Sequence, residues 1–218
     1  MLTELSQQQL ELIYAYRHIL LMAQNYTGVP WIALAAIWYR ESSLTFGRNP
    51  FQFDPVPAQD YQKYLYEKYS TTSPHEISTY LFQGVNNFQA AAVLAACFLK
   101  HKGAGFLTGD QVKNSFWAYN GRAYGSAEKS PYVMNNVDQW HKDMHIKGTI
   151  DGKPLPPNTI DKQLGAYGVW LQLREKEREL KHSGSDCPII PLQLLESDDP
   201  GDEQAYIEAP GTEKGERA

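Results

Sequence analysis

One carboxylic acid in this chain is placed where general acid chemistry would need it. Glu41 lies near the end of a predicted helix that begins at Pro30. It continues an apolar stripe with i, i+3, i+4 and i+7 spacing, whose other members are Leu34, Ile37 and Trp38. Apolar neighbours disfavour the charged form of a carboxyl group and raise its pKa. An acid that stays protonated near neutral pH can protonate the leaving oxygen of a glycosidic bond.

A purely structural role for Glu41 is the alternative. A glutamate at a helix end can pair with a neighbouring cation, here Arg40 or Arg48, or accept a hydrogen bond from a backbone N–H group. Such pairs also shift pKa values, so the helix alone does not separate the two roles.

Further polar and aromatic side chains follow in two segments. A loop rich in Gly, Pro and Asn follows the helix and contains Gln52 and Asp54. Later, the run Phe-Trp-Ala-Tyr-Asn-Gly ends another predicted helix and contains Tyr119 and Asn120, and Tyr132 follows in a Ser-Pro-Tyr-Val run. Tyrosine rings beside amides are suited to sugar contacts, because they present broad amphipathic surfaces.

Taken in order, these motifs resemble those of the soluble lytic transglycosylases and are similar to those of the goose-type lysozymes, both in the lysozyme-like superfamily. The resemblance rests on Glu-Ser at a helix end, a loop with Gln, then Ala-Tyr-Asn and a later Tyr-Val, and it spans residues 28–140. It implies that Glu41 is the general acid and base. It further implies a sugar-binding groove lined by Ser42, Gln52, Tyr119, Asn120 and Tyr132. The chain departs from the family pattern in the loop, where Asn-Pro-Phe replaces Gly-Leu-Met before Gln52 and the segment is short.

The role of Asp54 decides between two reactions. A glycosidase that activates water needs a second carboxylate, about 6.5–9.5 Å from the acid if it inverts and about 5–5.5 Å if it retains. Goose-type lysozymes resemble this chain in having an acidic residue at that place, whereas a lytic transglycosylase needs only one carboxyl group. Asp54 is therefore a candidate catalytic residue, or else a turn residue before Pro55.

Composition excludes several other classes. The net charge of −5 is uneven: residues from 183 onward hold nine acidic and two basic residues, a charge of −7, which leaves about +2 on residues 1–182. A nearly neutral body argues against nucleic acid as a partner.

No apolar run is long enough to span a membrane, and the N-terminus does not read as a signal peptide. Cys97 is expected to be a small buried hydrophobe, and the i, i+4 pair His141 and His145 lacks a third metal ligand, so we expect no cofactor and no metal.

The chain is predicted to be mainly α, a lysozyme-like helical domain with at most a small β-hairpin, followed by a C-terminal helix and an acidic tail. Periodicity predicts one helix around residues 12–23, one over 30–43, one over the tyrosine-rich segment 61–69, one around 91–98 and one ending near 117. Ser6 with Gln9 forms a predicted capping box before the first of these helices, and Thr108 or Asp110 is the predicted cap of the last. We expect residues 1–150 to form the catalytic domain, 151–182 a linker and helix (the linker over 151–158, the helix over 160–182), and 183–218 a Pro-rich tail, flexible or docked on a partner.

Two functions are compatible with these observations. The first is an enzyme that cuts the glycan strand of peptidoglycan, as a lytic transglycosylase or a muramidase, made in the cytoplasm and acting at the bacterial cell wall. A phage virion, a phage lysis system or a dedicated secretion apparatus would deliver it. The second is a weakly active or inactive lysozyme-like component of a larger assembly such as a virion, with the acidic tail contacting a protein partner.

Overall fold

The computed structural model describes residues 3–46, 50–52, 88–150 and 153–183. The chain divides into two compact units, 1–186 and 187–218, and every described residue belongs to the first. The fold is mainly helical, as predicted. Its elements are α1 (Gln7–Ala15), α2 (Arg17–Thr27), α3 (Trp31–Ser42), α6 (Phe88–His101), α7 (Gly109–Tyr119), α8 (Pro131–Met134), the 3-10 helix η1 (Gln139–His141), β1 (Thr149–Ile150), β2 (Lys153–Pro154) and α9 (Ala166–Ser183).

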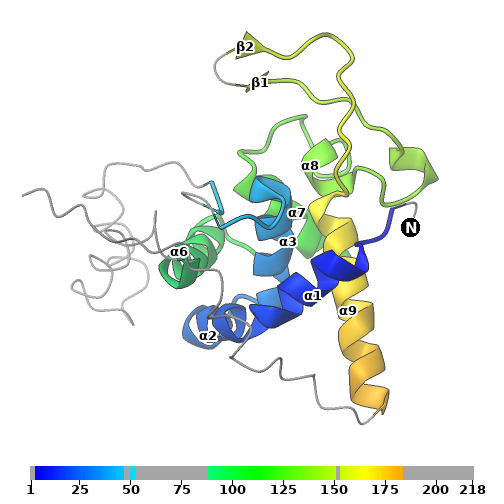
Figure 1. Cartoon of the computed structure of the whole chain (residues 1–218). Helices are drawn as coiled ribbons and strands as arrows, with labels where there is room; N and C mark the ends of the chain where they lie inside the picture. Colours follow the sequence, from blue (N-terminus) through cyan, green and yellow to red (C-terminus); the bar gives the residue numbers. More distant parts are fainter. Residues whose placement is uncertain (1–2, 47–49, 53–87, 151–152, 184–218) are drawn as a thin grey trace, which may run out of the picture. The chain divides into compact units, whose positions relative to one another are not determined.

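Helix α3 is the centre of this unit. Figure 1 shows it between α6 and α9, and it packs most extensively on α9 and then on α2. Every residue from Trp31 to Tyr39 is buried. The apolar stripe inferred from spacing is therefore one face of a helix that is covered on all sides, which is why its sequence contains so few polar residues.

The N-terminal region forms two helices instead of the single one predicted around residues 12–23. The predicted capping box at the start of α1 is confirmed: Ser6 Oγ accepts from the Gln9 N–H at 3.2 Å, and Gln9 Oε1 accepts from the Ser6 N–H at 2.9 Å. The break falls at Tyr16, where the backbone leaves the helical region. No Pro or Gly marks this position, so the sequence pattern continued through it.

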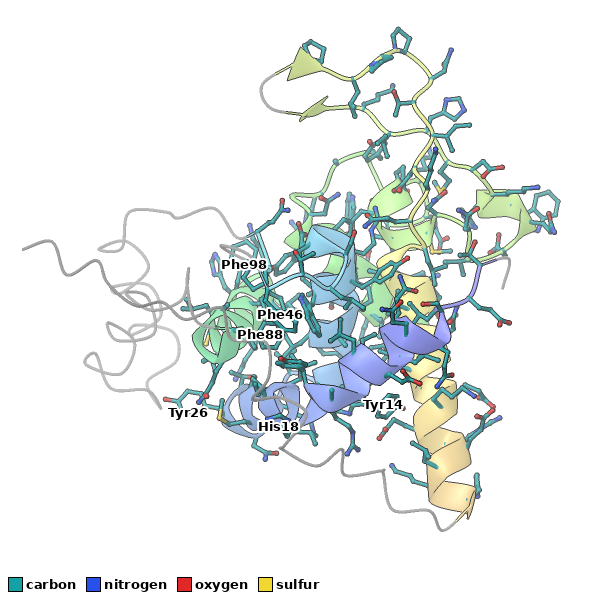
Figure 2. The ribbon with its side chains drawn as sticks, viewed as in Figure 1. Tyr14, His18, Tyr26, Phe46, Phe88 and Phe98 are labelled. Atoms are coloured by element: carbon teal, nitrogen blue, oxygen red, sulfur yellow. The ribbon has the colours of Figure 1, made fainter. Side chains whose placement is uncertain are left out.

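The Tyr16 ring belongs to an aromatic cluster that joins the N-terminal helices to α3 and α6. It lies 5.9 Å from Trp38 and 4.4 Å from Phe46, measured between ring centroids. Phe46 and Phe88 are neighbours in Figure 2, with centroids 5.3 Å apart, and Phe88 lies 5.6 Å from Phe51. Edge-to-face and tilted aromatic pairs of this kind add to the stabilisation from buried area. The cluster fixes the turn that follows α3.

Helices α6 and α7 match their predictions. The alanine-rich face of α6 is buried, which allows close packing against α2. Thr108, one of the two caps proposed, begins α7 by accepting from the Gln111 N–H at 3.2 Å. Cys97 is half-buried against the core, and burial raises the pKa of its thiol to about 11.

The segment expected to be a linker folds back on the chain before it. β1 and β2 pair in antiparallel register, His145 forms an isolated bridge with Ile160, and the Ile146 N–H donates to the Thr159 carbonyl at 2.8 Å. Figure 1 shows this arm projecting beyond α8. The small β-hairpin allowed by the sequence is thus present.

The C-terminal helix begins at Ala166, later than the expected residue 160, because the residues before it run against α3 and α8. Gly165 makes this approach possible: a Cβ atom there would lie 2.3 Å from the Val133 carbonyl oxygen. The Gly165 N–H donates to the Asn135 carbonyl at 2.8 Å. Helix α9 then buries Val169 and Leu173 against α3.

Candidate active site

Glu41 occupies the last turn of α3. The helix ends because Ser43 and Leu44 adopt left-handed backbone conformations, with φ of 54° and 66°. Trp38 Nε1 then donates to the Thr45 carbonyl at 2.9 Å, which fixes the turn on the end of the helix. Glu41 is half-buried as a result, at the junction between the core helix and the loop that follows it.

Burial raises the pKa of Glu41 from 4.5 to about 7. Two neighbours oppose this shift, the Tyr132 hydroxyl first and the Arg40 guanidinium second. Among the described residues, no carboxylate shifts this pKa and no residue forms an ion pair with Glu41. A carboxyl group with its pKa in this range can gain and lose its proton near neutral pH, as a general acid requires.

The expected alternative, a Glu41–Arg40 ion pair, is not what the structure contains. Arg40 pairs instead with Asp161: Nη2 lies 2.7 Å from Oδ2 and Nη1 lies 3.4 Å from Oδ1. Both side chains are almost completely buried, at 6% and 7% exposed. Arg48, the other proposed partner, lies outside the described residues.

The segment around Asp161 is itself held by a buried amide. Asn135, fully buried after α8, donates from Nδ2 to the carbonyls of Asp161 at 2.9 Å and Gln163 at 2.6 Å. Its Oδ1 accepts from the Met144 N–H at 2.8 Å. Asn135 thus uses both ends of its side chain to fix the ion-pair partner of Arg40.

Tyr132 lies beside Glu41, in agreement with its predicted place near the acid. It belongs to α8 and is buried, with the Arg40 guanidinium 5.1 Å from its ring centroid. Its hydroxyl has no partner that meets full hydrogen-bond geometry among the described residues, although it is close enough to Glu41 to lower the pKa of that carboxyl. Burial and the Glu41 charge keep the pKa of Tyr132 well above its ordinary value.

Gln52 and Tyr119 meet at the loop after α3. The Gln52 side-chain amide donates to the backbone carbonyl of Glu41, and Gln52 itself has a φ of 45°. The Tyr119 hydroxyl donates to the Phe51 carbonyl at 2.7 Å, a buried hydrogen bond between α7 and this loop. Tyr119 also acts electrostatically on Tyr132. Both predicted residues therefore lie at the Glu41 site, with Tyr119 holding the loop.

The remaining predicted site residues have different surroundings. Ser42 donates from Oγ to the Trp38 carbonyl at 3.1 Å and contacts the Thr45 carbonyl at 3.3 Å, so its hydroxyl closes the end of α3. Asn120 caps the C-terminus of α7 and is half-buried. Asp54 lies outside the described residues, as does the tyrosine-rich segment at 61–69.

The sequence did not predict the two residues that hold Arg40 next to Glu41, namely Asp161, which pairs with Arg40, and Asn135, which bonds to the Asp161 backbone. Asp161 lies in a stretch predicted to be the start of a helix, and the sequence predicted no role for Asn135. A buried carboxylate 121 positions from its arginine has no local signature. The histidines singled out by spacing do not share a helix, since His141 lies in η1 beside Asp138 at 2.8 Å while His145 lies in the extended arm.

The fold and site together define a mainly helical protein with a half-buried carboxyl group of raised pKa at the end of its central helix. No family model matches the chain, and neither a curated protein nor a solved structure matches it. Within the described ranges, no group of three or more His, Cys, Asp or Glu side chains is arranged to hold a metal ion. In the same part of the chain, no helix combines the length and the apolar character needed to cross a membrane.

Proposed function

We propose that this protein is a peptidoglycan-cleaving glycosidase that acts on the bond between N-acetylmuramic acid and N-acetylglucosamine. The observation that carries the proposal is the state of Glu41: half-buried, without an ion pair in the described residues, and with a pKa raised to about 7. A carboxyl group in this state can donate a proton at neutral pH and then accept one.

The surroundings of Glu41 support this assignment. Tyr132, from the distant α8, acts on the Glu41 carboxyl, and Gln52, from the loop after α3, donates to the Glu41 backbone carbonyl; both were expected from the family resemblance. The Arg40–Asp161 pair removes the nearest cation from direct pairing with Glu41. An unpaired acid beside polar side chains is what a glycosidase would need.

In this proposal Glu41 protonates the glycosidic oxygen as the bond breaks. In a lytic transglycosylase, the same carboxylate would then take the proton from the muramic acid C6 hydroxyl, which closes the anhydro ring. In a muramidase, a second carboxylate would assist water, and Asp54 remains our candidate for that role. We propose delivery to the cell wall by a phage virion, a phage lysis system or a dedicated secretion apparatus.

The test is mass spectrometry of purified peptidoglycan digested with wild type and with Glu41→Gln. We expect soluble glycan fragments from wild type and a loss of several orders of magnitude in the variant, because proton donation is removed. Glu11→Gln, a change at an exposed helix position, is the matched control and should digest like wild type. Fragments ending in 1,6-anhydro-muramic acid identify a transglycosylase, and reducing muramic ends identify a muramidase. Equal digestion by Glu41→Gln would refute the proposal.

A second candidate is a structural or glycan-binding component without turnover. The observation that favours it concerns two residues predicted to bind sugar, whose hydroxyls donate hydrogen bonds within the protein. The Tyr119 hydroxyl donates to the Phe51 carbonyl, and the Ser42 hydroxyl donates to the Trp38 carbonyl of its own helix. Such a protein would sediment with insoluble peptidoglycan and release no fragments. Binding that is equal in wild type and Glu41→Gln, with no products from either, would select this candidate.

A further inference from the structure

A second polar site lies at the opposite end of α3 from Glu41. A pocket of about 520 Å³ is formed by α2, the start of α3 and the C-terminal half of α9, whose end is prominent in Figure 1. Its lining includes Arg17, Trp31, Arg174, Glu177, Arg178 and Lys181. The start of α3 at Trp31 is about 15 Å from Glu41 at the rise of an α-helix, so the pocket is separate from the candidate active site.

Three of the four charged α9 residues that line the pocket are basic. Arg174, Arg178 and Lys181 fall at i, i+4 and i+7 and all line the pocket, whereas the acidic Glu175 and Glu179 do not. Like charges at this spacing repel and disfavour the helix. Arg178 contacts Glu175 at 2.5 Å on the exposed surface, and Lys181 makes no ion pair within the described residues. An anion in the pocket would relieve this repulsion.

A fourth cation reaches the same pocket from α2. Arg17 pairs through Nη2 with Glu177 Oε2 at 2.9 Å, and its guanidinium lies 5.2 Å from the Trp31 ring centroid. Arg17 Nε and Glu177 Oε1 are buried and have no partner among the described residues. With four cationic side chains and the single carboxylate of Glu177, the lining carries a formal charge of +3. The pocket therefore has an excess of positive charge and one buried donor, Arg17 Nε, without a partner among the described residues.

We propose that this pocket binds the phosphoryl group of a small phosphate ester, such as a phosphorylated sugar or polyol. Arginine forks bind phosphate and carboxylate oxygens in pairs, but one carboxylate satisfies only one fork. Arg17, Arg174 and Arg178 all line this one pocket, and a tetrahedral dianion offers acceptor oxygens to more than one of them. Leu21 and Pro30 add apolar surface for the body of the ester. This binding is independent of the function proposed for Glu41.

The test is isothermal titration calorimetry of the full chain with glycerol 3-phosphate and with inorganic phosphate. We expect saturable binding by wild type and at least a tenfold loss of affinity in Arg174→Gln/Arg178→Gln, two exposed positions whose change leaves the core intact. The matched control is Lys142→Gln/Lys147→Gln, which removes the same charge from exposed positions outside the pocket and should bind like wild type. Circular dichroism confirms that both variants are folded.

Vesicles separate a lipid headgroup from a soluble ester. Sedimentation with phosphatidylglycerol vesicles but not with phosphatidylcholine vesicles, lost in the arginine variant, would assign the phosphoryl group to a lipid. Binding of glycerol 3-phosphate without vesicle binding would assign it to a soluble ester. The proposal fails if neither phosphate probe binds, if acetate or glycerol binds as well as they do, or if the lysine control weakens binding equally. Because the readout is binding, failure here leaves the role of Glu41 untouched.

Discussion

At the scale of single residues, the protonation of Glu41 couples the candidate site to stability. Its pKa is about 7 in the folded protein and 4.5 ordinarily, so between these values the folded chain holds more protons than the unfolded chain. The free energy of unfolding therefore falls as pH rises through this window. A shift of this size corresponds to roughly 3 kcal/mol at most.

Glu41→Gln should remove this pH dependence. Glutamine cannot ionise, so we expect the variant to be more stable than wild type at pH 8, by up to about 3 kcal/mol, with the gain vanishing near pH 4.5. Urea denaturation of both proteins at pH 5 and pH 8 measures the difference. A stability gap that does not change between the two pH values would show that the Glu41 pKa is ordinary.

Tyr132→Phe tests the group that acts most strongly against the raised pKa. The Tyr132 hydroxyl lowers the pKa of Glu41, so its removal should raise that pKa further and move the alkaline limb of the activity profile to higher pH. The fold should be kept, because the hydroxyl has no strict hydrogen-bond partner among the described residues. The measurement is activity against peptidoglycan between pH 5 and pH 9 for wild type and Tyr132→Phe, with the melting temperature of both as the control. An unmoved alkaline limb would contradict this coupling.

At the scale of elements, the C-terminus of α3 is held by a segment that enters from before α9. Arg40 bonds to Asp161, and Gln163 Nε2 donates to the Ser43 hydroxyl at 2.8 Å. These contacts fix the helix end that presents Glu41. The acid therefore depends on residues more than 100 positions away, which act by positioning.

Asp161→Asn should expose this dependence. Breaking a buried ion pair leaves an uncompensated charge, and we expect the free energy of unfolding to fall by about 3 kcal/mol. The freed positive charge of Arg40 should also lower the pKa of Glu41 and shift the alkaline limb to lower pH. Denaturation and a pH profile measure the two effects. Glu179→Gln, which breaks the exposed Lys176–Glu179 pair, is the control and should change both far less.

At the scale of the whole molecule, the described core belongs to the unit that ends at residue 186. Residues 187–218 hold eight acidic and two basic residues, a charge of −6, so the unit before them carries about +1. A chain truncated after Asp186 should fold with an unchanged melting temperature and a higher isoelectric point. Calorimetry and isoelectric focusing check both. A melting temperature lowered by many degrees would show that the core needs the acidic segment.

Local signals in the sequence predicted the helices with strong periodicity and caps, including the box at Ser6 and the cap at Thr108. They also predicted Glu41 as a carboxyl group with a raised pKa. They did not predict the break at Tyr16, whose ring packs in the aromatic cluster, or the Arg40–Asp161 pair, which joins residues far apart in the chain. Local patterns report which face is apolar, and they contain no information on distant polar partners.

Because α3 is surrounded on all sides, its backbone amides cannot reach water by local fraying in the middle of the helix. Their hydrogens should exchange with deuterium only when the whole unit opens, at the rate set by global unfolding. Glu41 stands one turn from this slowest-exchanging stretch, while Gln52 stands on the loop after it. The carboxyl group of the site is thus carried by the helix that we expect to open last.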